Sequence, residues 1–445
     1  ANESLSARIV SPVKDPLVCE AVAWTPGTNG TIVARAYHMI PPDDPTREEL
    51  DAFFAGHRGR VRGRIVLAGR HQPVPVNFKT PERRLNEEQL KALYDPNRAG
   101  QPRAGGTQQQ QNAQQGPARV NQQQVSDEVD QFLFGSGALM RVIGSGEPHG
   151  RIRAYINRTR AHGRLVPAVV LRNEDYGRVT RIIAGGTPVE LEFDIVNRFY
   201  PEGRTAYNVI AEIRGTDKRD EVVMLGAHLD AHHLATGATD NAVNCAVVME
   251  AVRVLKVLGV RPRRTIRIGL WSGEEQRVLG SQAYVREHFG TFENPKPDFD
   301  RFGGYLNLDT GTARIRGMRV FGPQETADVL RRILAPFADL GVVGAGTYSN
   351  RTSPGSDHAA FSVAGLPGVY IDQDPVEYGE ATWHTNVDTY ERVVEDDAKM
   401  NSVVIASAVY HLAMRDDLLP RFGREQMPPP ALPTPGPTPA QRKRS

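Results

Sequence analysis

Three short apolar runs in the second half of the chain end in side chains that bind divalent metals. The first run ends at His228, the second at the pair Glu274-Glu275 and the third at Asp309. Runs this short and rich in Val, Ile and Leu predict buried parallel strands. Because such strands end at one edge of a sheet, we expect these side chains to converge. Imidazole and carboxylate together suit zinc, with cobalt or manganese as substitutes.

Two further candidate ligands lie outside these runs. Asp240 precedes a stretch in which Val243, Val247 and Leu255 recur at helical spacing, so its carboxylate is expected at the positive end of a helix dipole. His384 follows about 75 residues after the third run. Taken singly, such residues are more often helix caps, core histidines or solvated acids. Together, at successive strand ends, they predict a metal site.

The order of these residues and their motifs resemble peptidase family M28, the co-catalytic zinc exopeptidases. The motifs are H-x-D at 228–230, T-D-N at 239–241, G-E-E at 273–275 and H-T-N-x-D-T at 384–389. Residues 258–265 and 270–276 look most like the carboxypeptidase Q-like branch. Several motifs in family order are a stronger signal than any one alone. The resemblance implies an α/β fold with a mostly parallel central sheet flanked by helices.

The resemblance also implies a role for each candidate. Two zinc ions are implied, with Asp240 between them, and Glu274 would be the general base that takes a proton from the attacking water and passes it to the leaving amine. The Asp240-Asn241 peptide bond is expected to be cis. The implied ligands of one ion are His228, Asp240 and Asp309, and those of the other are Asp240, Glu275 and His384.

Two aspartates are expected to support the histidine ligands. Asp230, two residues after His228, is placed to hydrogen-bond the other ring nitrogen of that histidine and so to join the catalytic set. Asp388 is placed to do the same for His384. Either residue alone is as often an ordinary turn aspartate.

The sequence leaves open which end of a peptide is bound. Asp357, in a loop with His358 that resembles the family's segment beside the substrate pocket, offers a carboxylate for a free amine. Arg351 or Arg392 offers a cation for a free carboxylate. We expect an aminopeptidase-type exopeptidase, with a carboxypeptidase or dipeptidase as the alternative. A third alternative is an inactive scaffold used for binding or assembly. The loss of a metal ligand would support it, but none of the candidate ligands is missing.

Composition narrows the class of protein. The formal net charge of +2 provides no basic field for nucleic acid, and no apolar run is long enough to span a membrane. The two cysteines, Cys19 and Cys245, exclude a disulfide-stapled fold. The chain begins with Ala1 and shows no leader, so we expect a signal segment that is removed or absent, and a secreted or periplasmic location. Peptide or dipeptide substrates are the expected partners, and a homo-oligomer stays open.

A length of 445 residues suggests two or three domains. The Gln-rich tract at 100–124 has no apolar face and is expected to be a surface excursion. The two amphipathic helices that usually open M28 catalytic domains are not visible, which predicts an exposed apolar strip on one face of the sheet. The expected divisions are strands of the catalytic domain at 1–33, a smaller β/α domain resembling a protease-associated insert at 34–199, the M28-like catalytic domain at 200–418 and a Pro-rich tail at 419–445.

Overall fold

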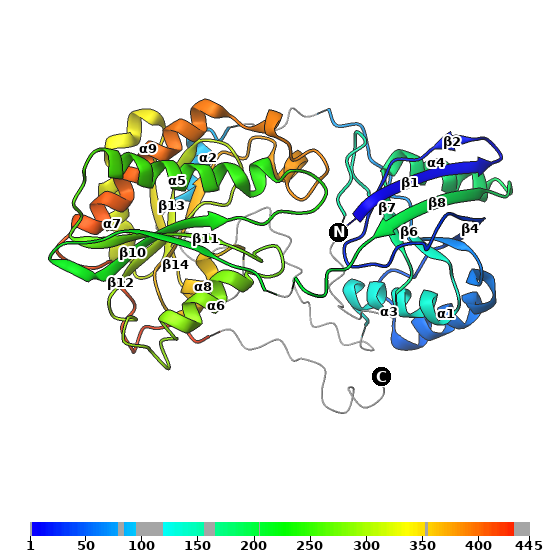
Figure 1. Cartoon of the computed structure of the whole chain (residues 1–445), viewed down its shortest axis with the longest axis horizontal. Coiled ribbons are helices and arrows are strands. Elements are labelled where there is room, and N and C mark those ends of the chain that lie inside the picture. The colour runs from blue at the N-terminus through cyan, green and yellow to red at the C-terminus, as the bar shows by residue number, and fades with distance from the viewer. Residues whose placement is uncertain are drawn as a thin grey trace.

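The computed structural model describes residues 2–78, 84–94, 119–154, 165–203, 205–351 and 355–430. These residues form two lobes that lie side by side, each built on its own sheet (Figure 1). Within the described ranges, no helix combines the length and the apolar character needed to cross a membrane.

The larger lobe contains a mostly parallel sheet. Its strands run in the order β14 (Gly344–Tyr348), β13 (Ile315–Phe321), β15 (Gly368–Gln373), β12 (Phe302–Asn307), β10 (Lys218–His228), β11 (Arg264–Trp271) and β9 (Val209–Ile213). Strand β9 is antiparallel to β11, and β13 is antiparallel to β15, whereas the other pairs are parallel. The α/β fold predicted from the sequence is confirmed.

Helices cover both faces of this sheet. One face carries α5 (Val243–Val257), α7 (Gln324–Leu334) and α9 (Glu395–Met414), and the other carries α6 (Leu279–His288) and α8 (His358–Ala364). Alternate residues of β10 divide between the two cores: Val223 and Leu225 pack toward α5 and α9, and Val222 and Met224 pack toward α6 and α8. From Val222 to Ala227 the strand is apolar because neither face meets water, whereas its first four residues are charged and lie outside the buried part.

The smaller lobe contains a mixed sheet. Its order is β2 (Asp15–Pro16), β1 (Asn2–Ser11), β8 (Glu190–Asn197), β4 (Ile32–Met39), β5 (Ile65–Ala68), β6 (Met140–Gly144), β7 (Ala168–Leu171) and β3 (Cys19–Ala21). Strands β4 to β7 are parallel and the remaining pairs are antiparallel. Helices α1 (Arg47–Val61), α3 (Gln122–Gly135) and α4 (Asn173–Ala184) complete this lobe (Figure 1).

The N-terminal strands do not belong to the catalytic lobe, so that part of the predicted division is wrong. Strand β1 pairs with β8 along its length, and Ile9 is buried with Leu191 and Phe193 in the core of the smaller lobe. The larger sheet instead leaves Val209 and Ile210 of its edge strand β9 exposed, at 50% and 39%. The resemblance of residues 34–199 to a protease-associated insert stays a prediction.

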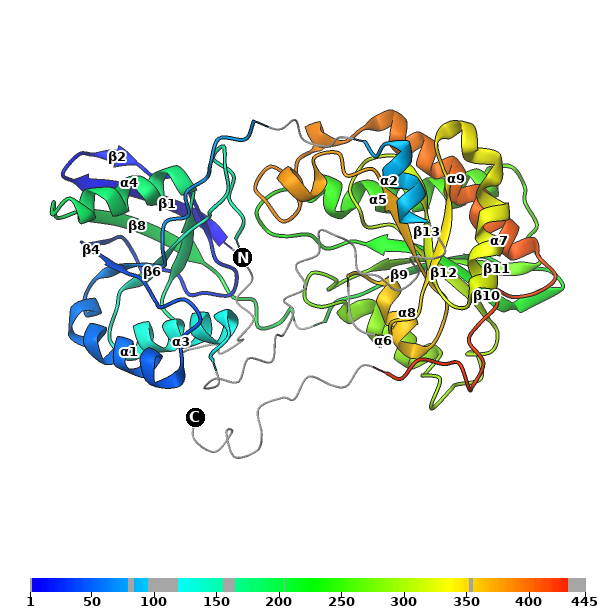
Figure 2. The same cartoon turned by 180° about the vertical axis from the view of Figure 1, so that it is seen from behind.

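One segment of the predicted insert packs on the larger lobe instead. Residues 84–94, which we call the strap, include α2 (Glu87–Leu93) and lie against the larger lobe in Figure 2. Arg84 forms ion pairs with the buried carboxylates of Asp374 and Asp397, at 3.0 and 2.8 Å.

At the other end of the strap, Tyr94 is fitted closely to the large sheet. Its hydroxyl donates to Asp372 at 3.2 Å, and its ring occupies the space that a Cβ at Gly317 would enter, 2.4 Å away. A side chain at Gly317 would therefore displace Tyr94 and loosen the strap.

The Gln-rich tract is shorter than predicted, because its end begins a helix. The side chain of Asn121 caps α3 by accepting from the amide of Gln124, at 2.9 Å. The apolar face of this helix, with Val125 and Val129 buried, starts just beyond the predicted tract. Residues 100–118 lie outside the described ranges.

The start of the predicted tail belongs to the fold. Leu419 is buried in the larger core, Arg421 donates to the carbonyl of Phe299 at 2.8 Å, and the carbonyl of Pro428 accepts from a buried arginine. Residues 431–445 lie outside the described ranges.

Candidate active site

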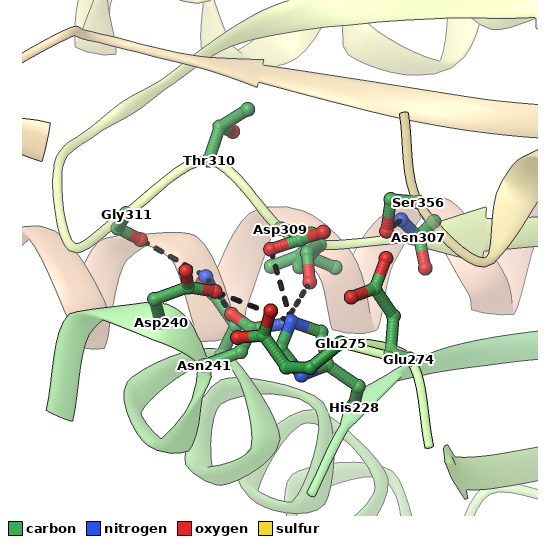
Figure 3. A network of polar contacts seen from close by, with 12 residues as sticks. His228, Asp240, Asn241, Glu274, Glu275, Asn307, Asp309, Thr310, Gly311 and Ser356 are labelled. Carbon is green, nitrogen blue, oxygen red and sulfur yellow. Dashed lines mark hydrogen bonds and ion pairs between the residues drawn. The ribbon is translucent and has the colours of Figure 1, made fainter. Parts of the chain in front are cut away.

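The segments that follow β10, β11 and β12 meet at the carboxyl edge of the larger sheet. His228 is the last residue of β10, Glu274 and Glu275 follow β11, and Asp309 follows β12. Figure 3 shows their side chains directed toward one another, together with Asp240. The convergence predicted from the strand ends is therefore present.

The first group of candidate ligands is His228, Asp240 and Asp309, all buried. Nε2 of His228 lies 3.2 Å from Oδ1 of Asp240 and 3.3 Å from Oδ1 of Asp309. Nδ1 of His228 donates to the carbonyl oxygen of Asp230 at 2.8 Å. Because a carbonyl can only accept, this bond fixes the proton on Nδ1 and directs Nε2 at the two carboxylates.

The second group is His232, Glu275 and His384. Nε2 of His384 lies 3.0 Å from Oε2 of Glu275 and 3.4 Å from Oδ2 of Asp240. Nε2 of His232 lies 3.4 Å from the same Oε2 of Glu275. Asp240 therefore directs one oxygen toward each group, as a residue that bridges two ions must.

His232 was missed by the reasoning from sequence. The signal was present, because three histidines, at 228, 232 and 233, stand within six positions. Only the strand-end histidine matched a motif, and histidines in a loop carry no periodicity that shows where they point. In the structure the ring of His232 stacks on His384, with centroids 3.9 Å apart and planes 19° apart.

Asp230 bonds the other ring nitrogen of His228, as predicted, but through its backbone carbonyl and not through its carboxylate. The carboxylate lies 3.9 Å from Nδ1 of His228, which bonds to the carbonyl of the same aspartate. The carboxylate accepts instead from the backbone amides of Glu274 at 3.0 Å and Glu275 at 3.2 Å. Asp230 therefore positions both glutamates.

Asp388 likewise supports a residue other than the predicted His384. Its carboxylate accepts from the amides of Thr239 at 2.6 Å and Asp240 at 3.1 Å. The Asp240-Asn241 bond is cis, as expected, and the side chain of Asn241 donates to the carbonyl of Leu308 at 2.9 Å. The segment that presents Asp240 is thus fixed from both sides.

The turn before this segment requires glycine. Gly237 has a φ of +66°, and a Cβ there would lie 2.2 Å from the Cβ of Ala231. It leads into the π-helix η2 (Ala238–Ala242), from which α5 continues. A larger residue would displace Asp240 from both candidate groups.

The predicted substrate contact of Arg351 is not formed. Arg351 is only 2% exposed. Its guanidinium makes a two-pronged ion pair with Glu293, at 2.7 and 3.1 Å, and also donates to the carbonyl of Pro428. The charge is already neutralised, which excludes Arg351 as the cation for a substrate carboxylate. The other candidate, Arg392, pairs with Glu377 at 2.9 Å.

Asp357 is enclosed by the protein, whereas His358 is half-buried. Asp357 is fully buried and accepts from the hydroxyl of Ser281 at 2.5 Å. Burial, opposed by the charge of His228, raises its pKa to about 7. Burial lowers the pKa of His358 to about 3, so this imidazole is neutral. The carboxylate of Asp357 is therefore not open to a substrate terminus.

The site concentrates buried carboxylates. Burial, followed by the charge of Asp309, raises the pKa of Glu274 to about 10, and burial also raises the pKa values of Glu275 and Asp309. Burial alone would lower the pKa of His228, but the charge of Asp309 and the bond to Asp240 raise it well above its usual value. Such a cluster favours added positive charge.

We expect the metal-free protein to lose stability as pH rises from about 7 to 9. The unfolded chain has already released the proton of Glu274, while the folded chain must release it against a pKa of about 10. The stability that is present below the pKa of the unfolded chain is therefore lost as the pH rises toward the pKa of the folded chain, by roughly 1 kcal/mol per pH unit. Urea unfolding of chelator-treated protein measures the slope. Glu274→Gln should flatten it, and an unchanged slope in that variant would assign the effect elsewhere.

The residues present fit divalent metal ions. Oδ2 of Asp240 and Oε1 of Glu275 are buried and have no hydrogen-bond partner among the described residues. In each group of three, the ligand atoms lie within 4.8 Å of one another. Imidazole nitrogens and carboxylate oxygens in sets of three or four are typical of zinc.

A cavity lies where the smaller lobe meets His233, and none of the candidate ligands is among its lining residues. It has a volume of about 1050 Å³, and its lining includes Trp24, Phe199, Tyr200 and His233.

Comparison with known proteins agrees with this geometry. Residues 208–409 match the model of peptidase family M28. Carboxypeptidase Q of Mus musculus is 28% identical over 258 residues, which are 58% of this chain and 52% of that protein. The chain thus spans about half the length of the curated relatives it matches.

Two solved structures share the fold. The M28 peptidase precursor of Shewanella amazonensis has a TM-score of 0.63 at 22% identity, over 96% of this chain and 83% of that one. BSAP, a zinc aminopeptidase from Bacillus subtilis, has a TM-score of 0.55 at 18% identity, over 93% and 82% of the two chains.

Proposed function

We propose that this protein, whose residues 208–409 match the model of peptidase family M28, is a dinuclear zinc exopeptidase that removes terminal residues from peptides. The observation that carries the proposal is the division of the site into two ligand groups that share Asp240. An inactive scaffold is disfavoured, because each of the five predicted ligands lies in one of the groups or between them.

The two ions would be held by His228, Asp240 and Asp309, and by Asp240, Glu275 and His384. When bound, two such ions acidify a water molecule and polarise the carbonyl of the scissile bond. Zinc is the metal that this donor set favours, with cobalt or manganese as substitutes.

Glu274 would move the proton. Its backbone amide is held by Asp230, so its carboxylate is fixed beside the ligands without being counted among them. Burial and neighbouring carboxylates hold its pKa at about 10, and positive charge at the site offsets that repulsion. As a carboxylate, Glu274 accepts the proton of the attacking water and then donates it to the leaving amine.

We propose an aminopeptidase-type specificity, because the cluster of buried carboxylates at the site favours added positive charge, such as that of a free amine. The alternative is a carboxypeptidase or dipeptidase. It is supported by the relatives named carboxypeptidase Q. We also propose a secreted or periplasmic location, and a protease-associated character for the smaller lobe.

The test combines metal analysis with a terminal-specificity panel. The purified chain, stripped with chelator and reconstituted with zinc, should bind two ions and hydrolyse peptides only when loaded. Peptides blocked at the amino terminus, blocked at the carboxyl terminus, or free at both ends are digested, and the products are ordered by mass spectrometry. Loss from the amino end supports the main proposal, and loss from the carboxyl end supports the alternative. Fewer than one zinc ion per chain after reconstitution, or no cleavage of any peptide, would refute both.

A further inference from the structure

We propose that His232 is an additional protein ligand of the zinc ion held by Asp240, Glu275 and His384. This inference rests on the proposed function, since it assigns a further residue to one of its two ions. It makes that ion the one with the greater number of protein donors.

The first argument is distance. Nε2 of His232 and Nε2 of His384 approach the same oxygen of Glu275, at 3.4 and 3.0 Å. The ligand atoms of these three residues lie within 4.8 Å of one another, as do those of the first group. His232 therefore satisfies the same geometric condition as the ligands predicted from the motifs.

The second argument is that neighbouring residues fix the direction of His232. Nε2 of His233 bonds to the carbonyl of Ala21 at 2.8 Å, and Leu234 is buried with Ile152 in a cluster shared with the smaller lobe. These contacts hold the two residues after His232 against the other lobe. His232 itself is directed to Glu275 on the side of the metal ligands, with its side chain 10% exposed.

The assignment also sets the number of protein donors that each ion would have. The first ion would have three protein ligands, His228, Asp240 and Asp309, which is the number at catalytic zinc sites that keep a position open. With His232, the second ion would have four, the number at closed structural sites. The two ions are then inequivalent, and the second is the more tightly held.

Stacking offers a competing role for His232, because its ring lies flat on His384 and could position that ligand without binding zinc. His232→Phe separates the two roles, since phenylalanine keeps the flat ring and removes the nitrogen. His233→Phe is the matched control, because its imidazole is the adjacent one and is bonded to Ala21 in the smaller lobe.

The experiment is a zinc titration of the metal-free full chain in competition with a chromophoric chelator. The unaltered protein should give two dissociation constants. His232→Phe should raise one of them by at least the roughly 10- to 100-fold that losing even an outer-sphere partner costs, and should leave the other unchanged. His233→Phe should retain both constants, since the buried Leu234 still holds the loop against the smaller lobe. In His232→Ala, added imidazole should restore the weakened site, which confirms ligation in a variant that leaves space for it.

The outcomes separate the two proposals. If His232→Phe keeps both constants while the unaltered chain binds two ions and cleaves peptides, the ligand assignment is wrong and the proposed function stands. If the unaltered chain binds fewer than two ions, both the dinuclear site and the His232 assignment fail. If both sites weaken equally and imidazole does not restore binding in His232→Ala, the residue acts on the fold of the loop, which also overturns the assignment.

Discussion

Glu274→Gln is expected to retain both zinc ions while the turnover number falls by about 100- to 10,000-fold, the typical cost of losing a general base. Glutamine has nearly the same shape and keeps the backbone amide that Asp230 holds, so the site should stay assembled. It cannot accept the proton of the attacking water. Steady-state kinetics on the zinc-loaded variant, with metal content measured on the same sample, checks the result.

The matched comparison is the adjacent Glu275→Gln. Glu275 lies 3.0 Å from His384, and a neutral amide is a poorer ligand than a carboxylate, so this variant should lose zinc before it loses anything else. Excess zinc should restore part of its activity and should do nothing for Glu274→Gln. Near-normal turnover in Glu274→Gln with full metal content would show that another group activates the water.

Asp240→Asn is expected to weaken both ions at once and to reduce hydrolysis below detection. Its two oxygens approach different groups, at 3.2 Å from His228 and 3.4 Å from His384. Asparagine replaces one oxygen with an NH2 group that cannot bind metal and leaves the other as a weaker neutral donor, so at least a roughly 10- to 100-fold loss of affinity is expected for each ion. Zinc titration with a competing chelator measures both constants.

Two single-site variants serve as controls for this effect. Asp309→Asn should weaken one ion and His384→Gln the other, since each residue lies in only one group. Thermal unfolding of the metal-free forms should show that all three variants are folded. If Asp240→Asn lost only one ion, the bridging assignment would be wrong, although the two groups could still bind metal separately.

The strands that position the site were predictable because parallel strands buried on both faces are apolar along their whole length. Val222 to Leu225 show this directly, and β11 shows it with Arg267 as the one charged exception between Ile266 and Leu270. A polar residue that ends such a run marks the sheet edge. The position of Asp240 followed from the helix signal after it. Convergence at the edge then required only the general rule for α/β sheets.

Residues in loops were placed less well, because their directions depend on partners distant in the sequence. Asp230 supports the glutamates through backbone amides, which no side-chain pattern reveals. The direction of His232 depends on contacts of its neighbours with the smaller lobe, and the burial of Arg351 depends on Glu293. The N-terminal strands were assigned to the wrong lobe for the same reason, since the pairing of β1 with β8 links segments about 185 residues apart.

The strap links the folding of the larger lobe to the order in which the chain is synthesised. Tyr94 and its partner Asp372 are 278 positions apart, and Arg84 and Asp397 are 313 apart. During synthesis from the N-terminus, residues 84–94 leave the ribosome long before the strands that receive them exist. The larger lobe therefore completes its folding with a segment that is synthesised before its own strands. A fragment that begins after the smaller lobe would lack the strap.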